Sequence, residues 1–218
     1  GNTALNLDSI SNIDGSNGSN TISFYGRGAN DFAGYSVSGI GDVNSDGYTD
    51  FAIGATNGGD DGKFYVVFGD TRTDLIALAS SSNASGLQNV LDGTSGFYST
   101  NTPFAALANP AAGSTVSSIG DFNGDNFDDF IVNMKGINLS LVVYGKSSAF
   151  DPSLNLSDIL STHVGGFGIA AGSDVVAGAG DFNGDNFDDI IIGDLGANDA
   201  YILFGTNNIA PLLQTAVA

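Results

Sequence analysis

The sequence predicts an all-β chain assembled from three similar units, and three observations lead to this prediction. A nonapeptide rich in Asp and Asn occurs three times, at 42–50, 121–129 and 181–189. Each copy is followed by a short apolar run of mostly β-branched residues, which is typical of a buried strand. All 24 acidic residues are Asp, which favours turns and caps, whereas the absent Glu is the better helix former.

The nonapeptide follows the pattern D-x-N-x-D-[GN]-aromatic-x-D, and a Gly precedes each copy. Side-chain oxygens at positions 1, 3, 5 and 9 can converge on one point if the loop curls tightly, and position 7 then turns its backbone carbonyl inward. A hard cation such as Ca²⁺ prefers an oxygen-only cage of this kind, so we predict about three Ca²⁺ ions, one per repeat. The predicted ligands are Asp42, Asn44, Asp46, Tyr48, Asp50, Asp121, Asn123, Asp125, Phe127, Asp129, Asp181, Asn183, Asp185, Phe187 and Asp189.

The loop also needs a residue at position 6 that tolerates positive φ, and the sequence supplies Gly47, Asn126 and Asn186 there. It is not an EF-hand loop, because position 12 is aliphatic in every copy where an EF-hand requires a bidentate Glu. The run that follows each loop favours a strand over a helix. We therefore expect the loops to lie between strands.

The first unit is preceded by an alternating run, Thr21–Tyr25, that predicts an N-terminal strand. Ala33–Ser38 is predicted as the strand before the first loop, and Phe51–Ala55 as the strand after it. A polar turn then leads to Lys63–Gly69, which is predicted to close the unit as a further strand.

The same order recurs twice along the chain. Strand candidates precede and close the second unit at 112–116 and 139–145, and the third unit at 171–176 and 200–205. Residues 75–110 form the longest linker, which is predicted to be irregular. The predicted parts are 1–70 (N-terminal strand and first repeat), 71–146 (long linker and second repeat), 147–206 (third repeat) and 207–218 (tail).

Repeats of this length, each with about four short strands, are the sequence signature of a β-propeller. The chain resembles the FG-GAP repeat of integrin α-subunit propellers, which also occurs in bacterial surface proteins and some lectins. The Phe-Gly of that family is matched by Ala33-Gly34, Ala112-Gly113 and Ala171-Gly172. Its Gly-Ala-Pro is matched only in the first unit, by Gly54-Ala55-Thr56.

The resemblance implies a ring of about seven blades, which three repeats cannot close. We therefore expect the blades to remain open, or to be completed by other copies or by a longer chain. A terminal strand commonly completes a blade in closed propellers, so Thr21–Tyr25 is a candidate to complete the last blade of a neighbouring copy by strand addition.

The composition excludes several classes of function. The formal net charge is −19, and the five basic residues are scattered, which argues against nucleic-acid binding. No apolar run approaches the roughly 18 residues needed to cross a bilayer, so we expect no membrane insertion. An acidic, Cys-free chain with calcium loops fits an extracellular or cell-surface location, because cytosolic Ca²⁺ is too dilute for weak sites.

The sequence offers no catalytic constellation. His163 is the single His, and without Cys or Glu it cannot build a zinc site of the usual kind. No G-x-S-x-G elbow is present, and the adjacent carboxylates Asp128-Asp129 and Asp188-Asp189 belong to the loops. The aromatic residue at position 7 of each loop is predicted to plug the core.

From these features we predict a non-enzymatic extracellular calcium-binding β-propeller module for adhesion or self-assembly, with Ca²⁺ stabilising each blade. A surface adhesin or a fibre component is the expected setting. The predicted partners are other copies of the protein, through strand addition at open blade edges, or a surface or glycan ligand. A carbohydrate-binding, lectin-like module is the alternative, because propellers of the resembling family include lectins.

Overall fold

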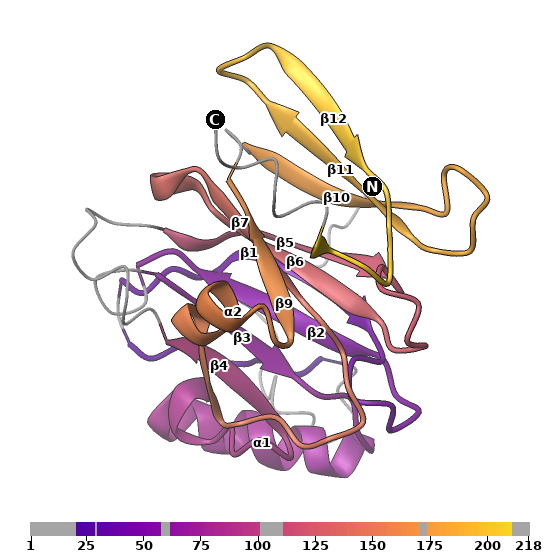
Figure 1. Cartoon of the computed structure of the whole chain (residues 1–218). Helices are drawn as coiled ribbons and strands as arrows, with labels where there is room; N and C mark the ends of the chain where they lie inside the picture. The colour runs from indigo at the N-terminus through magenta and orange to yellow at the C-terminus, as the bar shows by residue number, and fades with distance from the viewer. Residues whose placement is uncertain (1–20, 29, 58–61, 101–110, 171–173, 211–218) are drawn as a thin grey trace, which may run out of the picture.

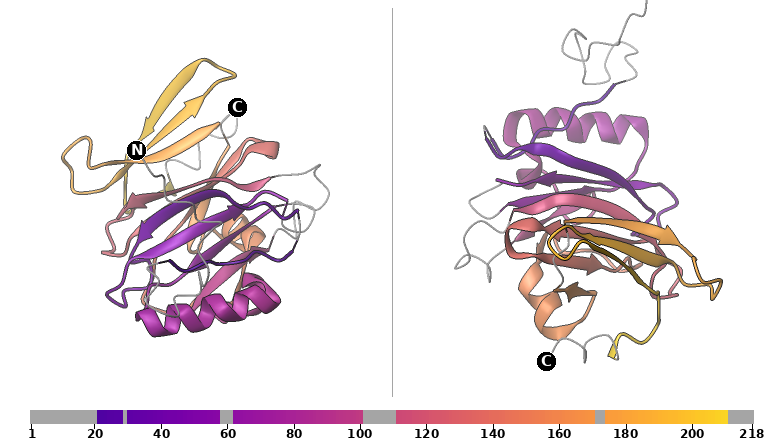
Figure 2. Two further views of the ribbon diagram at one scale, coloured as in Figure 1. Left: turned by 180° about the vertical axis from the view of Figure 1, so that it is seen from behind. Right: turned by 90° about the horizontal axis from the view of Figure 1, so that it is seen from above.

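Three sheets stack face to face, and a helix covers one end of the stack (Figures 1 and 2). The structure is a computed structural model that describes residues 21–28, 30–57, 62–100, 111–170 and 174–210. The prediction of an all-β architecture of propeller-type blades is confirmed at the level of the sheets. The described blades do not close into a ring.

The first sheet has the strand order β1-β2-β3-β4-β8, with β8 parallel to β4 and the other pairs antiparallel. Its strands are β1 (Ala33–Gly41), β2 (Asp50–Ala55), β3 (Lys63–Val67), β4 (Gly96–Thr100) and β8 (Ser153–Asn155). The predicted strands before, after and closing the first loop are therefore confirmed.

The second and third sheets are antiparallel throughout. The second sheet contains β5 (Ala112–Gly120), β6 (Asp129–Met134), β7 (Leu139–Val143) and β9 (Gly166–Ile169). The third contains β10 (Val175–Gly180), β11 (Asp189–Asp194) and β12 (Asp199–Leu203). The outermost strands β4 and β9 follow the predicted repeat boundaries in sequence, so each of the first two blades extends into the next predicted repeat.

The described part of the linker 75–110, which is residues 75–100, is not irregular as predicted, and residues 101–110 lie outside the described residues. It contains most of α1 (Arg72–Ser85), the 3-10 turn η3 (Leu87–Asn89) and strand β4. The helix begins where the Thr71 hydroxyl accepts the N–H of Asp74, which satisfies a free donor of the first turn. Absence of Glu argued against helices, but Leu and Ala, which are abundant in this segment, are themselves good helix formers. A second helix, α2 (Leu156–Thr162), and a 3-10 turn, η4 (Lys135–Ile137), lie in later connections.

The predicted strand Thr21–Tyr25 is not formed, since only Ile22 takes part in a bridge. The segment lies against the first blade instead. The Phe24 ring packs 5.3 Å from the Phe51 ring, and the Tyr25 carbonyl accepts the N–H of Leu87 at 2.8 Å. The described part of the segment is therefore engaged within its own chain.

Each space between layers holds its own apolar core. Between the first and second sheets, Phe64 packs edge-on against Phe130 with ring centroids 5.9 Å apart. A second core, which includes Phe122 and Val176, joins the second and third sheets. A third lies between the first sheet and α1, where Leu75 and other helix residues cover β2 and β3. Apolar burial at about 25 cal/mol per Å² makes this stacking the main source of stability.

A Gly follows the closing strand of every blade because the chain is crowded at that point. A Cβ added at Gly145 would lie 2.8 Å from the Phe127 Cβ and 2.9 Å from the Val43 carbonyl oxygen of the preceding blade. At the equivalent Gly205 it would lie 2.6 Å from the Phe187 Cβ and 2.8 Å from the Phe122 carbonyl oxygen. These distances are too short for real Cβ contacts, so Gly is required where the closing strand meets two loops.

We predict that Gly145→Ala lowers the free energy of unfolding by about 1–3 kcal/mol, because the added methyl must displace backbone from two blades. Urea denaturation followed by circular dichroism measures this loss. Gly28→Ala is the matched control, since its Cβ would meet nothing within 4 Å. Equal stability of the two variants would contradict the crowding described at the closing Gly.

Candidate metal-binding loops

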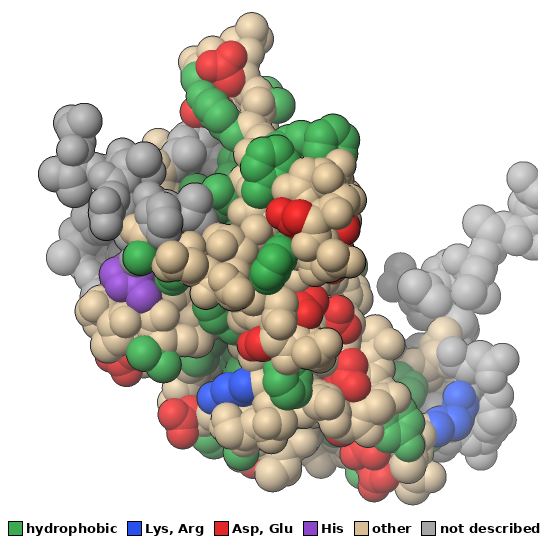
Figure 3. Space-filling view, turned by 45° about the vertical axis from the view of Figure 1, so that its right-hand side comes forward, with side chains coloured by type: hydrophobic (Ala, Val, Ile, Leu, Met, Phe, Trp, Pro, Cys, Tyr) green, Lys and Arg blue, Asp and Glu red, His purple; other side chains and the backbone are tan. Residues whose placement is uncertain are grey.

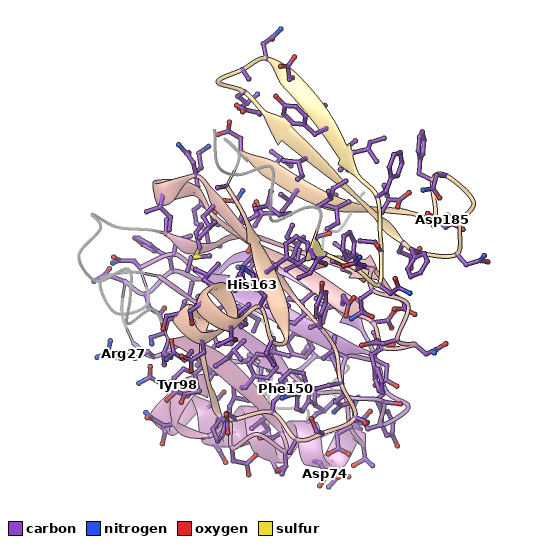
Figure 4. The ribbon with its side chains drawn as sticks, viewed as in Figure 1. Arg27, Asp74, Tyr98, Phe150, His163 and Asp185 are labelled. Carbon is purple, nitrogen blue, oxygen red and sulfur yellow. The ribbon has the colours of Figure 1, made fainter. Side chains whose placement is uncertain are left out.

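The three nonapeptide loops connect the first and second strands of their blades, as predicted. They leave the stack at the same edge, and Figure 4 shows Asp185 on the third loop, which projects away from the sheets. The residues at position 6 have positive φ values of 89° at Gly47, 68° at Asn126 and 71° at Asn186. The predicted tight curl is therefore confirmed.

The position 1 carboxylate organises each loop by accepting backbone N–H groups from its far side. In the first loop, Asp42 accepts the N–H of Asp46 at 3.0 Å and that of Gly47 at 2.9 Å. In the second loop, Asp121 accepts the N–H of Asp125 at 2.9 Å and that of Asn126 at 2.8 Å. The third loop repeats this arrangement around Asp181. One carboxylate thereby closes the curl.

Positions 3 and 5 lie beside that carboxylate. The Asn44 Oδ1 accepts the same Asp46 N–H at 3.0 Å, so oxygens from positions 1 and 3 converge on one donor. The Asn44 amide donates in turn to Asp46 Oδ2 at 2.8 Å. The other loops have the same pairs, Asn123 with Asp125 and Asn183 with Asp185. Positions 1, 3 and 5 are thus gathered in every loop.

The position 9 carboxylate has a different place, because it is fully buried in all three loops. Asp50 accepts the N–H of Val43 at 2.9 Å with one oxygen and that of Gly69 at 2.7 Å with the other. The same two bonds recur in the later blades, from Phe122 and Gly145 to Asp129 and from Phe182 and Gly205 to Asp189. Position 9 therefore ties the loop to the Gly after the closing strand.

Burial raises the pKa of Asp50 to about 7 and that of Asp129 to about 8. The carboxylates at positions 1 and 5 of each loop raise these pKa values further by repulsion, whereas the backbone N–H donors lower them. The three carboxylates of each of these loops are therefore close enough to repel one another.

The position 7 residues do not plug the core as predicted. Tyr48 is 48% exposed, and Phe127 and Phe187 are half-buried. The plug is the residue at position 2, because Val43 and Phe122 are fully buried between blades. The position 7 N–H donates to the position 5 carboxylate, at 2.8 Å in the first loop. The Phe187 ring instead lies against Gly124 of the preceding loop, where an added Cβ would meet it.

The predicted ligands of each loop lie at different depths in the blade. Positions 1, 3 and 5 are gathered near the surface, while the position 9 carboxylate is turned into the blade. Within the described ranges, no group of three or more Asp or His side chains is arranged to hold a metal ion. The donor set is nevertheless made only of oxygens, and a carboxylate with about four lone-pair sites can accept an N–H and contact a cation together.

Position 8 has a role that the sequence analysis missed. Asp128 Oδ2 accepts the N–H of Asp42, in the preceding loop, at 2.8 Å. Asp188 Oδ2 accepts the N–H of Asp121 at 2.9 Å in the same way. The first loop has Thr49 at this position. The repetition of Asp at position 8 in the second and third loops was the available signal, and it marks the contact between neighbouring blades.

A further backbone bond joins each pair of loops. Lys146, directly after the closing Gly of the second blade, donates its N–H to the Val43 carbonyl at 2.9 Å. Thr206 donates to the Phe122 carbonyl at 2.9 Å in the third blade. Each blade thus contributes an acceptor at position 8 and a donor after its closing Gly to the loop of the blade before it.

Two other features lie apart from the loops. His163 is exposed and ends α2 in the left-handed conformation with φ 57° (Figure 4). A hollow of about 360 Å³ lies between the first and second blades, lined by Phe32, Tyr35, Thr56, Asn57, Ala111, Ser114, Lys135 and Gly136. Its Phe32 and Tyr35 rings are 57% and 64% exposed. The hollow is thus wide open and of mixed polarity.

Comparison with known families gives one match, to the FG-GAP repeat, over residues 33–67. This range runs from β1 to β3 and includes the first loop, so the predicted resemblance is confirmed for the first unit. Comparison with curated proteins gives no match. FG-GAP repeats are β-propeller blades, typically of extracellular proteins and generally without enzymatic activity. None of the helices in the described part is long and apolar enough to cross a membrane.

We predict that Asp128→Ala lowers the free energy of unfolding by about 1–3 kcal/mol, because the Asp42 N–H loses its acceptor at a contact between blades. Thr49→Ala is the matched control at the same loop position, and as an exposed residue it should change stability by less than about 0.5 kcal/mol. Urea denaturation in the presence of a chelator compares the two without any contribution from metal ions. Equal effects would show that position 8 does not couple the blades.

Proposed function

We propose that the chain is a non-enzymatic, extracellular calcium-binding β-propeller module that serves adhesion or self-assembly. The observation that carries this proposal is the repetition of one loop geometry in all three blades. In each loop, oxygens from positions 1 and 3 meet on a single N–H beside the position 5 carboxylate.

The chemistry of the loops favours a hard divalent cation. Asp42, Asn44 and Asp46, with their equivalents in the later loops, would provide the exposed side-chain oxygens. The position 9 carboxylate would contribute from the buried side, together with the position 7 carbonyl. When bound, Ca²⁺ would supply positive charge where carboxylates repel one another. The loops' own N–H bonds would keep the oxygens gathered before the ion arrives.

The third blade supports the assembly part of the proposal. The first two blades have an outer strand, β4 or β9, beside their closing strand, whereas in the described residues β12 pairs only with β11. An unpaired edge of this kind can accept a strand from another chain. Phe24 and Tyr25 contact their own blade, so the donor strand would be another segment of a second copy.

We expect millimolar Ca²⁺ to raise the melting temperature strongly relative to a chelator, because a cation at 100 times its Kd contributes about 2.7 kcal/mol per site. The triple variant Asp46→Asn, Asp125→Asn and Asp185→Asn should lose most of this shift, since it removes one charged ligand from each loop. Differential scanning calorimetry measures the shift, and light scattering on the same samples measures assembly.

The matched control replaces three exposed carboxylates outside the loops, Asp151, Asp158 and Asp199, by Asn and changes the net charge equally. It should keep the Ca²⁺ shift. No Ca²⁺ effect on the parent chain would reject the calcium part of the proposal. A Ca²⁺-stabilised monomer at all concentrations would reject self-assembly and leave adhesion to a ligand.

A carbohydrate-binding module is the second candidate, and the hollow between the first two blades is the observation that favours it. Its open aromatic rings offer apolar faces, while Asn57, Ser114 and Lys135 add amide, hydroxyl and ammonium groups. Lys135 is held by an ion pair with Asp174 at 3.1 Å. Concave sites with aromatic walls and a few polar groups are typical of small-ligand recognition.

If this candidate is right, a glycan array should show selective binding that Tyr35→Ala weakens at least about tenfold, or about 1.4 kcal/mol. The loss is expected because the exposed Tyr35 ring forms one wall of the hollow. Tyr48→Ala, which removes a similarly exposed ring outside the hollow, is the matched control. Binding that is absent, or equally affected by both variants, would reject the hollow as a glycan site.

A further inference from the structure

The outer face of the third sheet, which is the face turned away from the second sheet, exposes an unusual number of large apolar side chains. Figure 3 shows hydrophobic side chains gathered in the upper part of the molecule, where this sheet lies. The exposed fractions are 57% for Val175, 67% for Phe182, 41% for Ile191, 38% for Ile202 and 49% for Phe204. Contiguous apolar surface of this kind marks interaction sites.

The equivalent positions in the second blade are covered. The counterparts of Phe182, Ile191 and Ile202 are Phe122, Ile131 and Val142, and each of them is fully buried against the third sheet. The counterparts in the first blade are Val43, Ala52 and Val66, which are fully buried against the second sheet. The exposed face thus has the composition of a surface that a following blade covers.

The polar contacts between blades also end at the third loop. A carboxylate from the following blade covers Gly41 and accepts the Asp42 N–H, and another does the same at Gly120 and Asp121. At the third loop, an added Cβ at Gly180 would meet nothing within 4 Å, and the Asp181 N–H has no such acceptor among the described residues. Among the described residues, both the apolar face of the third sheet and the polar groups at the start of the third loop therefore lack the partner that the other two blades have.

The opposite end of the stack differs. Helix α1 packs on the outer face of the first sheet, where Ile53, Tyr65 and Val67 are buried beneath it, although Val37 is 68% exposed. The first loop carries Thr49 where the other two carry Asp. The first blade of a second copy would therefore bring a helix-covered face and no position 8 carboxylate to the third sheet.

We infer that the outer face of the third sheet is an interaction surface for a further blade of the same design. That blade has an apolar face toward Ile191 and Ile202 and an Asp at position 8 of its loop that accepts the Asp181 N–H. The residue after its closing Gly donates to the Phe182 carbonyl. This inference follows from the two contacts between described blades and does not depend on calcium binding or on strand addition.

The test adds such a blade to the full chain by inserting a duplicate of residues 146–205 between Gly205 and Thr206. The duplicate then follows Gly205 as the original follows Gly145, and it supplies its own copy of Asp188. Backbone hydrogen exchange should slow at least about tenfold at Asp181 relative to the parent chain, because the amide gains a carboxylate acceptor.

The matched control carries Asp188→Ala in the duplicate only. Asp181 should then lose the added protection, while Asp121, held by the original Asp188, should keep its own. Unchanged exchange at Asp181 in a duplicated chain that gains the expected β-sheet signal in circular dichroism would overturn the inference.

A second measurement uses the parent chain and the dye ANS, which binds exposed apolar surface. The parent chain should bind ANS, and Phe182→Asp should lower this binding without loss of β-sheet signal. A monomeric parent chain that binds no ANS would overturn the inference, since its own residues would already cover the face. A parent dimer with Asp181 protected, which Phe182→Asp converts to monomer, would also overturn it, because a second copy would then be the occupant.

Discussion

The buried carboxylate at position 9 of each loop is the interaction on which the blades depend. Asp50, Asp129 and Asp189 each join the start of a loop, the start of the second strand and the Gly after the closing strand. A buried carboxylate without such donors would be strongly unfavourable, so the two N–H groups and the carboxylate fix one another. The nonapeptide therefore has a structural role in the blade that is separate from any metal.

Local patterns in the sequence predicted the parts of the fold that local chemistry decides. The strands around the first two loops and the positive φ at Asn126 and Asn186 follow from residue type and spacing, and both are confirmed. Part of the strand predicted at 171–176, before the third loop, lies outside the described residues, and β10 begins at Val175. Helix α1 was missed because the lack of Glu was given more weight than the Leu and Ala of its own segment. Strands β4 and β9 are short and pair with partners distant in sequence, so no local pattern marks them.

The loops show that a ligand pattern predicts which oxygen atoms a loop carries better than it predicts where each side chain points. Spacing identified which oxygens each loop carries, and positions 1, 3 and 5 are gathered as expected. It did not reveal that position 9 points into the blade, because that direction is set by the Gly69 N–H, which lies well beyond the loop. Position 8 was missed for the same reason, since its partner belongs to another blade. Tertiary contacts with residues outside the loop therefore determine the orientation of the side chains at positions 8 and 9.

The contacts between blades give the stack a direction. A loop supplies the position 1 N–H and the position 2 carbonyl, and the following blade supplies the position 8 Asp and the N–H after its closing Gly. Thr49 departs from Asp in the one described blade whose outer face is covered by a helix. The third loop keeps Gly180 and Asp181, the two residues that a following blade would contact. A helix covers one end of the described stack, while at the other end an added Cβ at Gly180 would meet nothing within 4 Å.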